Sequence, residues 1–228
     1  ANTLAAHMDY DTPGAVQRVA DFWHSEKLAA GPGYKAVDLF EAVHRGDIRV
    51  LWVMGTNPAV SLPDNARVRE ALARCETLIV SDCVAQTDTT AFADILLPAA
   101  GWGEKDGTVT NSERCISRQR RFLPVPEGVR PDWRIIRDIA QALGYGHAFD
   151  YQEPAEIFRE HAALSGYGNG GERVFDISAL AKLSSTEYDR LQPVQWPLTG
   201  GNPGAWLQTR RLFSDGRFPT PDGRARLV

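Results

Sequence analysis

The sequence predicts an α/β fold in which a parallel sheet is covered by helices on both faces, with long irregular segments beside it. Three apolar runs, at residues 48–54, 77–80 and 95–97, have the length and the branched side chains of strands. Segments with helical spacing of apolar residues separate them, and turn residues stand at their boundaries. This β-α-β-α-β alternation is typical of a parallel sheet with connecting helices.

Two helices are expected before the first strand. Thr12 and Pro13 have the pattern of a helix start, with a capping residue followed by proline at the first helical position. A second helix is expected from about Lys35 to Gly46, because glycine is common just after the last helical turn.

The parallel unit is expected to begin at the strand over residues 48–54. This run is nearly all apolar, so we expect both of its faces to be covered. Asp64 or Asn65 can cap the helix that follows. The next expected elements are a strand at residues 77–80, a short helix at 89–93 and a strand at 95–97 that ends at Pro98.

The helical and strand patterns are lost between residues 101 and 130, and such a long irregular segment is more often functional than idle. Further helices are expected from Asp132 to Gly144, from Pro154, and as one or two turns within residues 178–191. Residues from about 192 to 228 are rich in Pro and Gly, and we expect them to be irregular. The length favours a single α/β domain over residues 1–228.

Composition excludes several classes of protein. The 228 residues carry a formal net charge of -4, which argues against a nucleic-acid binder, and no apolar run is long enough to span a membrane. The cysteines, Cys75, Cys83 and Cys115, are odd in number and lack a C-x-x-C pair, so we expect no disulfide framework and a cytoplasmic location. Three cysteines cannot hold a four-cysteine iron–sulfur cluster, and the histidines lack zinc-ligand spacing.

Polar residues follow two neighbouring strands of the predicted sheet. Gly55 and Asn57 follow the first strand, and Ser81 and Asp82 end the second. Ligands of open α/β sheets bind just beyond the carboxyl ends of the strands, and a carboxylate placed there binds ribose hydroxyls in dinucleotide folds. The layout therefore predicts a nucleotide-like ligand. The alternative is that Asn57 lies in a plain strand-end turn and that Asp82 caps the turn after it.

Two later residues complete the candidate site. Lys105 can supply a mobile positive charge to a diphosphate, although most lysines are simply exposed. Asp132 can accept hydrogen bonds from a guanine base, or it can act only as a helix cap. The arginines after residue 113 can hold phosphate, pair with a neighbouring domain or form a solvated face.

The sequence shows no reaction centre of its own. It contains no G-x-S-x-G elbow, no phosphate-binding P-loop and no G-x-G-x-x-G fingerprint. Cys83 lies beside the candidate site, and we expect it to be a small buried hydrophobic residue rather than a nucleophile.

Longer stretches resemble a known family. The runs TNPAVSLPD (56–64) and VSDCVAQTDTTAFADILLPAAGWGEKDGTVTNSER (80–114) resemble the molybdopterin oxidoreductases of the dimethyl sulfoxide reductase family. Within it, WGEKDGTVTNSER, PAEIFREHAALSG and PVQWP most resemble the cytoplasmic assimilatory nitrate reductases, and formate dehydrogenases carry a less close version. The resemblance covers essentially the whole chain. One departure is Cys115, where relatives commonly have a second Arg after the NSER motif, and it weakens any role for the arginines.

The resemblance implies a fragment of a larger enzyme, and the chain ends, with no initiator Met, support that expectation. Family members have an N-terminal iron–sulfur domain, two α/β domains and a C-terminal barrel, and this chain resembles most of the third, Rossmann-like domain. The parent would carry Mo-bis(molybdopterin guanine dinucleotide) and a [4Fe-4S] cluster. Family contacts to one guanine dinucleotide arm fall on Asn57, Ser81, Asp82, Lys105 and Asp132.

The expected function is therefore a part of a nitrate reductase catalytic subunit that is inactive alone and retains no cofactor by itself. Its partners would be the missing domains of the parent chain and an electron donor, with no nucleic acid and no membrane. Two alternatives stay open: a fragment of a formate dehydrogenase α subunit, and a stand-alone nucleotide-binding α/β module without a redox role.

Overall fold

The computed structural model describes residues 5–25, 27–29, 31–200, 211–218, 220 and 222–226. The chain divides into two compact units. The parallel-sheet unit comprises Pro32–Asp106 and Arg120–Asp150, and the antiparallel-sheet unit comprises Ala1–Gly31, Gly107–Gln119 and Tyr151–Val228. The single domain expected over residues 1–228 stays a prediction.

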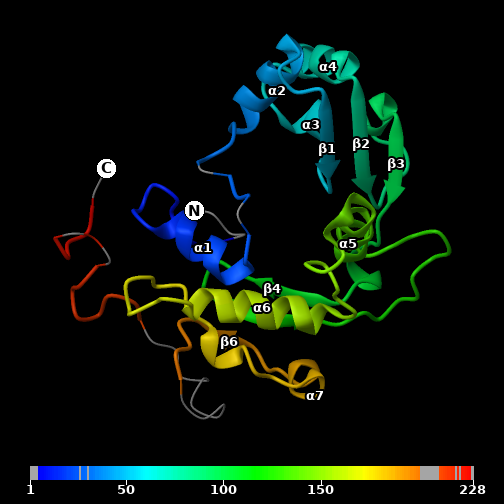
Figure 1. Ribbon diagram of the computed structural model, residues 1–228. Helices are drawn as coiled ribbons and strands as arrows, with labels where there is room; N and C mark the ends of the chain where they lie inside the picture. The colour runs from blue at the N-terminus through cyan, green and yellow to red at the C-terminus, as the bar shows by residue number, and fades with distance from the viewer. Residues whose placement is uncertain are drawn as a thin grey trace. The chain divides into compact units, whose positions relative to one another are not determined.

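The parallel-sheet unit contains the three strands that the apolar runs predict. They are β1 (Val50–Met54), β2 (Thr77–Asp82) and β3 (Ile95–Pro98), in the order β1-β2-β3 (Figure 1). Both pairings are parallel, with Val53 opposite Val80 and Val80 opposite Leu96. The α/β, Rossmann-like fold class is confirmed. The carboxyl ends of all three strands consequently lie at one edge of the sheet.

Helices cover the sheet face that carries the core of this unit. They are α2 (Ala36–Arg45), which ends at Gly46 in a left-handed conformation as expected, the single turn α3 (Pro58–Ser61) and α4 (Asn65–Arg74). Asp64 precedes α4 but makes no side-chain cap hydrogen bond. The core contains Phe40, Val43, Leu51, Val53, Ala59, Val68, Ala71, Leu72, Leu78 and Val80.

Strand β1 is buried on one face rather than on two, so that expectation was wrong. Leu51 and Val53 on one face are buried, whereas Val50 on the other face is 60% exposed. On β3, Ile95 is 46% exposed. Successive side chains of a strand point to opposite faces, so an apolar run alone does not say how many faces are covered.

The remaining elements of this unit are short. They are the 3-10 turns η1 (Thr90–Phe92) and η2 (Trp102–Glu104), the helix α5 (Asp132–Ala140) and the π-helical turn η3 (Gln141–Tyr145). Gly144 has φ 91°, which favours glycine, and the predicted helix end at this residue is confirmed.

The antiparallel-sheet unit contains strands that the sequence does not reveal. They are β4 (Gly107–Thr110), β5 (Cys115–Gln119) and β6 (Val194–Gln195), in the order β4-β5-β6. The expectation of irregular structure throughout residues 101–130 was therefore wrong. The irregular segment expected from about residue 192 to 228 stays a prediction; β6 occupies two of its residues, and residues 201–210 lie outside the described part. These strands are short and partly polar, and β5 pairs with a strand far along the chain, so no local period marks them.

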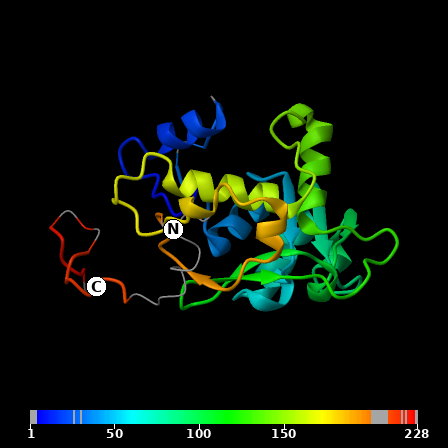
Figure 2. The ribbon, with the colours of Figure 1, turned by 90° about the horizontal axis from the view of Figure 1, so that it is seen from below.

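The described residues of this unit also form four helical elements: α1 (Ala15–Trp23), α6 (Pro154–Gly166), the 3-10 turn η4 (Ser178–Leu180) and α7 (Ser185–Asp189). Helix α6 begins at Pro154 as predicted and lies alongside the antiparallel sheet in both views (Figures 1 and 2). Helix α1 begins at Ala15 rather than at Pro13, because Gly14 occupies the N-cap position with φ 80°.

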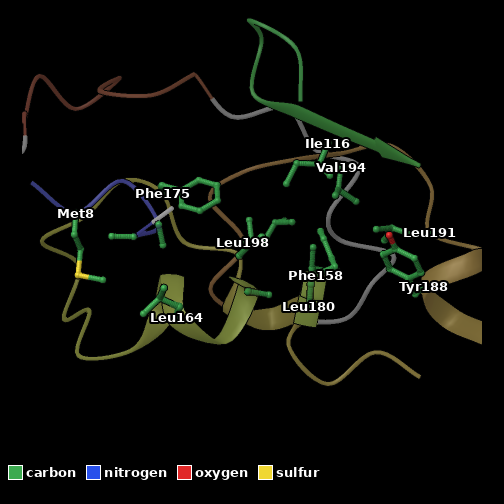
Figure 3. Packing of buried hydrophobic residues seen from close by; sticks show 14 of the residues in the cluster. Met8, Ile116, Phe158, Leu164, Phe175, Leu180, Tyr188, Leu191, Val194 and Leu198 are labelled. Atoms are coloured by element: carbon green, nitrogen blue, oxygen red, sulfur yellow. The ribbon is translucent and has the colours of Figure 1, made fainter. Parts of the chain in front are cut away.

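A second hydrophobic core stabilises the antiparallel-sheet unit. Ile116 from β5 and Val194 from β6 lie on the same side of this core, facing Phe158 of α6 and Leu180 of η4 (Figure 3). Arg118 of β5 is also buried here, with its guanidinium 3.9 Å from the ring centroid of Tyr188. It is therefore part of the packing and not a solvated charge.

Candidate nucleotide site at the carboxyl edge of the parallel sheet

Asn57 follows β1 after a sharp turn at Gly55, where φ is 60°. The Gly55 N–H donates to the Ser81 carbonyl oxygen at 2.9 Å, so the turn is tied to the end of β2. Asn57 Oδ1 accepts two hydrogen bonds from Thr89, from its backbone N–H at 3.2 Å and from its hydroxyl at 2.6 Å. The Asn57 side chain is half-buried, so it is both anchored and accessible.

Ser81 and Asp82 end β2 but have different surroundings. Ser81 is fully buried, and its hydroxyl accepts a hydrogen bond from Trp52 Nε1 at 2.8 Å. A direct contact between this hydroxyl and a ligand stays a prediction, and its burial argues against it. Asp82 is half-buried, and one of its carboxylate oxygens accepts from the Val84 N–H at 2.9 Å. The interpretation that Asp82 caps the next turn is thus confirmed, and its second carboxylate oxygen makes no hydrogen bond with the residues that the structure describes.

Lys105 and Asp132 lie together. Lys105 Nζ is 2.6 Å from Asp132 Oδ2, and the two side chains are 30% and 35% exposed. Asp132 is the first residue of α5, and the residue at the cap position is Pro131. The helix-cap interpretation of Asp132 was therefore wrong, because its carboxylate pairs with Lys105 instead of with the helix N–H groups.

Two local structures bring this ion pair to the same sheet edge. Ala99, just after β3, forms a parallel bridge with Arg130, and the Ala100 N–H donates to the Arg130 carbonyl oxygen at 2.9 Å. This bridge places the start of α5 close to the carboxyl end of β3. In η2, the Glu104 carboxylate accepts from the Gly101 N–H at 2.7 Å and holds the turn that precedes Lys105.

The five predicted residues thus follow the carboxyl ends of neighbouring strands within one unit. Asn57 follows β1, Ser81 and Asp82 end β2, and the Lys105–Asp132 pair follows β3. This edge offers both hydrogen-bond donors and acceptors, which suits a ligand with phosphate, hydroxyl and base groups.

Sequence reasoning missed Thr89 and Trp52, the residues that hold Asn57 and Ser81. Their signals are weak: Thr89 lies in a polar run, QTDTT, and Trp52 lies inside an apolar strand. Cys83 was expected to be buried and is exposed, because it follows the last residue of β2 in a surface turn. All three cysteines are free.

The arginines after residue 113 are divided between the two units. Arg114 donates to the Trp196 carbonyl oxygen at 2.9 Å, and Arg118 Nη2 lies 3.1 Å from Asp189 Oδ1. Both belong to the antiparallel-sheet unit, whereas Arg120 and Arg121 belong to the other. In the part of the chain that the structure describes, no group of three or more His, Cys, Asp or Glu side chains could hold a metal ion. Within the same part, no helix has both the length and the apolar character to cross a membrane.

The family model of the molybdopterin oxidoreductases matches residues 2–142. The chain belongs to the molybdopterin oxidoreductase family. A nitrate reductase of Klebsiella oxytoca is 54% identical over 96% of the chain, and a nitrate reductase of Shewanella frigidimarina is 42% identical over all of it. The chain covers 25% and 24% of these relatives, so it corresponds to about a quarter of a longer molybdopterin oxidoreductase.

Other proteins match less closely. An F420-dependent formate dehydrogenase subunit alpha of Methanocaldococcus jannaschii is 35% identical over 79% of the chain. Among solved structures, acetylene hydratase from Pelobacter acetylenicus superposes on 82% of this chain and 23% of its own, with a TM-score of 0.58 and 15% identity. At that identity the likeness concerns the fold alone.

Proposed function

We propose that this chain is the part of a molybdenum-dependent nitrate reductase catalytic subunit that holds one guanine dinucleotide arm of Mo-bis(molybdopterin guanine dinucleotide). Support comes from the family membership and from the nitrate reductase relatives, the more similar of which is 54% identical. Each of these relatives is about four times longer, so nitrate reduction belongs to the parent protein.

The observation that carries this proposal is the shared edge of the parallel sheet, where Asn57, Asp82 and the Lys105–Asp132 pair follow successive strands. The donors and acceptors at this edge fit the group. Asn57 Nδ2 and the second carboxylate oxygens of Asp82 and Asp132 make no hydrogen bond with the described residues. Gly55 adds open space, since no heavy atom lies within 4 Å of where a Cβ would be.

Each residue then has a role in binding and orienting the nucleotide end. Asn57 binds the phosphate and ribose region, and Asp82 accepts hydrogen bonds from the ribose hydroxyls. Lys105 supplies positive charge to the diphosphate, and Asp132 accepts hydrogen bonds from guanine N1–H and N2–H₂. When bound in the parent, the cofactor would supply the two-electron reduction of nitrate to nitrite, with electrons arriving through a [4Fe-4S] cluster elsewhere in the chain. The Ser81 hydroxyl, already bonded to Trp52, would act indirectly by fixing the end of β2.

Nucleotide titration of the 228-residue chain tests this proposal. We expect GDP to bind more tightly than ADP or NAD, since only guanine offers two adjacent donors to Asp132. Affinity will be modest, because a half-site does not enclose its ligand. Tight NAD binding would instead favour a stand-alone nucleotide-binding module, and the absence of any GDP binding would contradict the proposed role.

Assays of the parent protein with nitrate and with formate distinguish a nitrate reductase from a formate dehydrogenase. The complete parent protein, with its cofactor, should reduce nitrate with a reduced dye and should not oxidise formate; formate oxidation would favour the dehydrogenase alternative. The isolated chain should do neither. The electron donor and the cytoplasmic location stay predictions.

A further inference from the structure

The side chain of Asn57 is held by a short relay of hydrogen bonds inside the parallel-sheet unit. Thr89 donates to Asn57 Oδ1 through both its backbone N–H and its hydroxyl, at 3.2 and 2.6 Å. The same hydroxyl oxygen accepts from the Ala59 N–H at 3.1 Å. Thr89 is fully buried, so water cannot replace these bonds.

This relay sets the orientation of the Asn57 amide. A carboxamide has an acceptor oxygen on one side and an NH₂ donor on the other. If the amide were flipped, its NH₂ group would face the Thr89 backbone N–H, and two donors would meet in a buried place, which is costly. The oxygen therefore points inward to Thr89, and Nδ2 points away from it.

We propose that Thr89 is a positioning residue for the nucleotide site, and that it makes Asn57 a hydrogen-bond donor toward the ligand. This inference rests on the proposed function, which it deepens by naming the ligand atom: Asn57 meets an acceptor oxygen, from the diphosphate or from a ribose hydroxyl. Asn57 Nδ2 has no acceptor among the described residues, and the open space at Gly55 lies at the same strand end.

The other side chains at the sheet edge support this assignment, because some are acceptors and some are donors. Asp82 and Asp132 present carboxylate oxygens, which repel phosphate and attract the donors of a sugar or a base. Donors for phosphate oxygens must come from elsewhere, and Asn57 Nδ2 and Lys105 Nζ are the groups of this set that provide them.

Four substitutions in the 228-residue chain test the proposal by GDP titration. Asn57→Asp keeps an oxygen toward Thr89 but replaces the outward NH₂ with an acceptor. Thr89→Val keeps the shape of the side chain and removes the hydroxyl, whereas Thr89→Ser keeps the hydroxyl. Thr90→Val is the matched control, because the Thr90 hydroxyl bonds only to Thr87 and Ala85 among the described residues.

We expect Asn57→Asp to weaken GDP binding by about ten- to hundredfold, the effect of losing a hydrogen bond to a charged group. Thr89→Val should weaken it severalfold, while Thr89→Ser and Thr90→Val should bind nearly as the parent sequence does. Guanosine, titrated in parallel, separates the two sources of oxygen: an equal loss in Asn57→Asp assigns the contact to the ribose, and a smaller loss assigns it to the diphosphate.

A measurement without ligand keeps the inference testable even if a variant is unstable. Scalar coupling across the hydrogen bond between the Thr89 amide nitrogen and Asn57 Cγ, observed by NMR in the unsubstituted chain, would confirm the inward oxygen. Absence of that coupling, or GDP binding by Asn57→Asp equal to that of the unsubstituted chain, overturns the inference. Failure of the unsubstituted chain to bind GDP overturns the proposed function itself, so the two failures are distinguishable.

Discussion

Asp132→Asn is the substitution that most directly tests guanine recognition. Lys105 Nζ contacts Asp132 Oδ2 at 2.6 Å, and the other carboxylate oxygen of Asp132 faces no donor among the described residues. In the variant, Lys105 should hold the one remaining carbonyl oxygen. The new NH₂ group would then face the guanine donors, so the interaction changes from attractive to repulsive.

The expected magnitude follows from these contacts. Hydrogen bonds to a charged acceptor contribute about 1.5–3 kcal/mol each, so losing even one should weaken GDP binding by about ten- to hundredfold. ADP binding should change little, because adenine does not present the same pair of donors. The ion pair is about one-third exposed on both sides, so its loss should cost folding at most about 1 kcal/mol.

The assay is competition between GDP and ADP, measured by calorimetry on the variant and on a matched control. Asp138→Asn is that control, since Asp138 lies on the same helix and pairs with Arg130 and Arg137 away from Lys105. Its melting temperature should fall by a few degrees, as in Asp132→Asn, but its preference for GDP should persist. If Asp132→Asn keeps the full preference for GDP, Asp132 does not read the base.

Three further predictions concern stability. Burial lowers the pKa of His161 below 6.5. The free energy of unfolding should therefore lose nothing to this residue above about pH 6.5, and should decrease as the pH falls toward the lowered pKa. In thermal melts at several pH values, His161→Phe should lose the acid sensitivity that His161 causes. Gly166→Ala should destabilise the chain by about 1–3 kcal/mol in urea, because a Cβ would overlap the Ser178 side chain, and an unchanged midpoint would contradict this packing. Arg118→Lys should also lower the urea midpoint, because a lysine cannot donate to Asp189 and to backbone carbonyl oxygens at the same time as a planar guanidinium does. Arg118→Met should be no more stable than the unsubstituted chain.

The parallel-sheet unit could be predicted because its signals are local. Each strand is an apolar run that ends in a turn residue, and Gly46 and Gly144 mark helix ends through conformations that favour glycine. The antiparallel sheet could not be predicted in this way. Its β5–β6 pairing joins Ile116 to Val194, and a contact so far apart in sequence leaves no period to detect.

The candidate site also has a part that local signals predict and a part that they do not. The rule that ligands bind beyond the carboxyl ends of parallel strands is a property of topology, so once the strands are predicted, Asn57 and Asp82 are indicated without any coordinates. Which hydrogen-bonding atoms remain available to a ligand depends on contacts with residues that are distant in sequence. Thr89 is 32 positions from Asn57, and Asp132 is 27 positions from Lys105.

These tertiary pairings change the chemistry expected of each residue. A free asparagine offers a ligand either an acceptor or a donor, but Asn57 with Thr89 behind it offers a donor. A free lysine offers its full charge to a phosphate, whereas Lys105 shares its charge with Asp132 and attracts a diphosphate less strongly. When Asp132→Asn removes the carboxylate charge, guanine selectivity should therefore fall, whereas the charge of Lys105 still attracts the diphosphate.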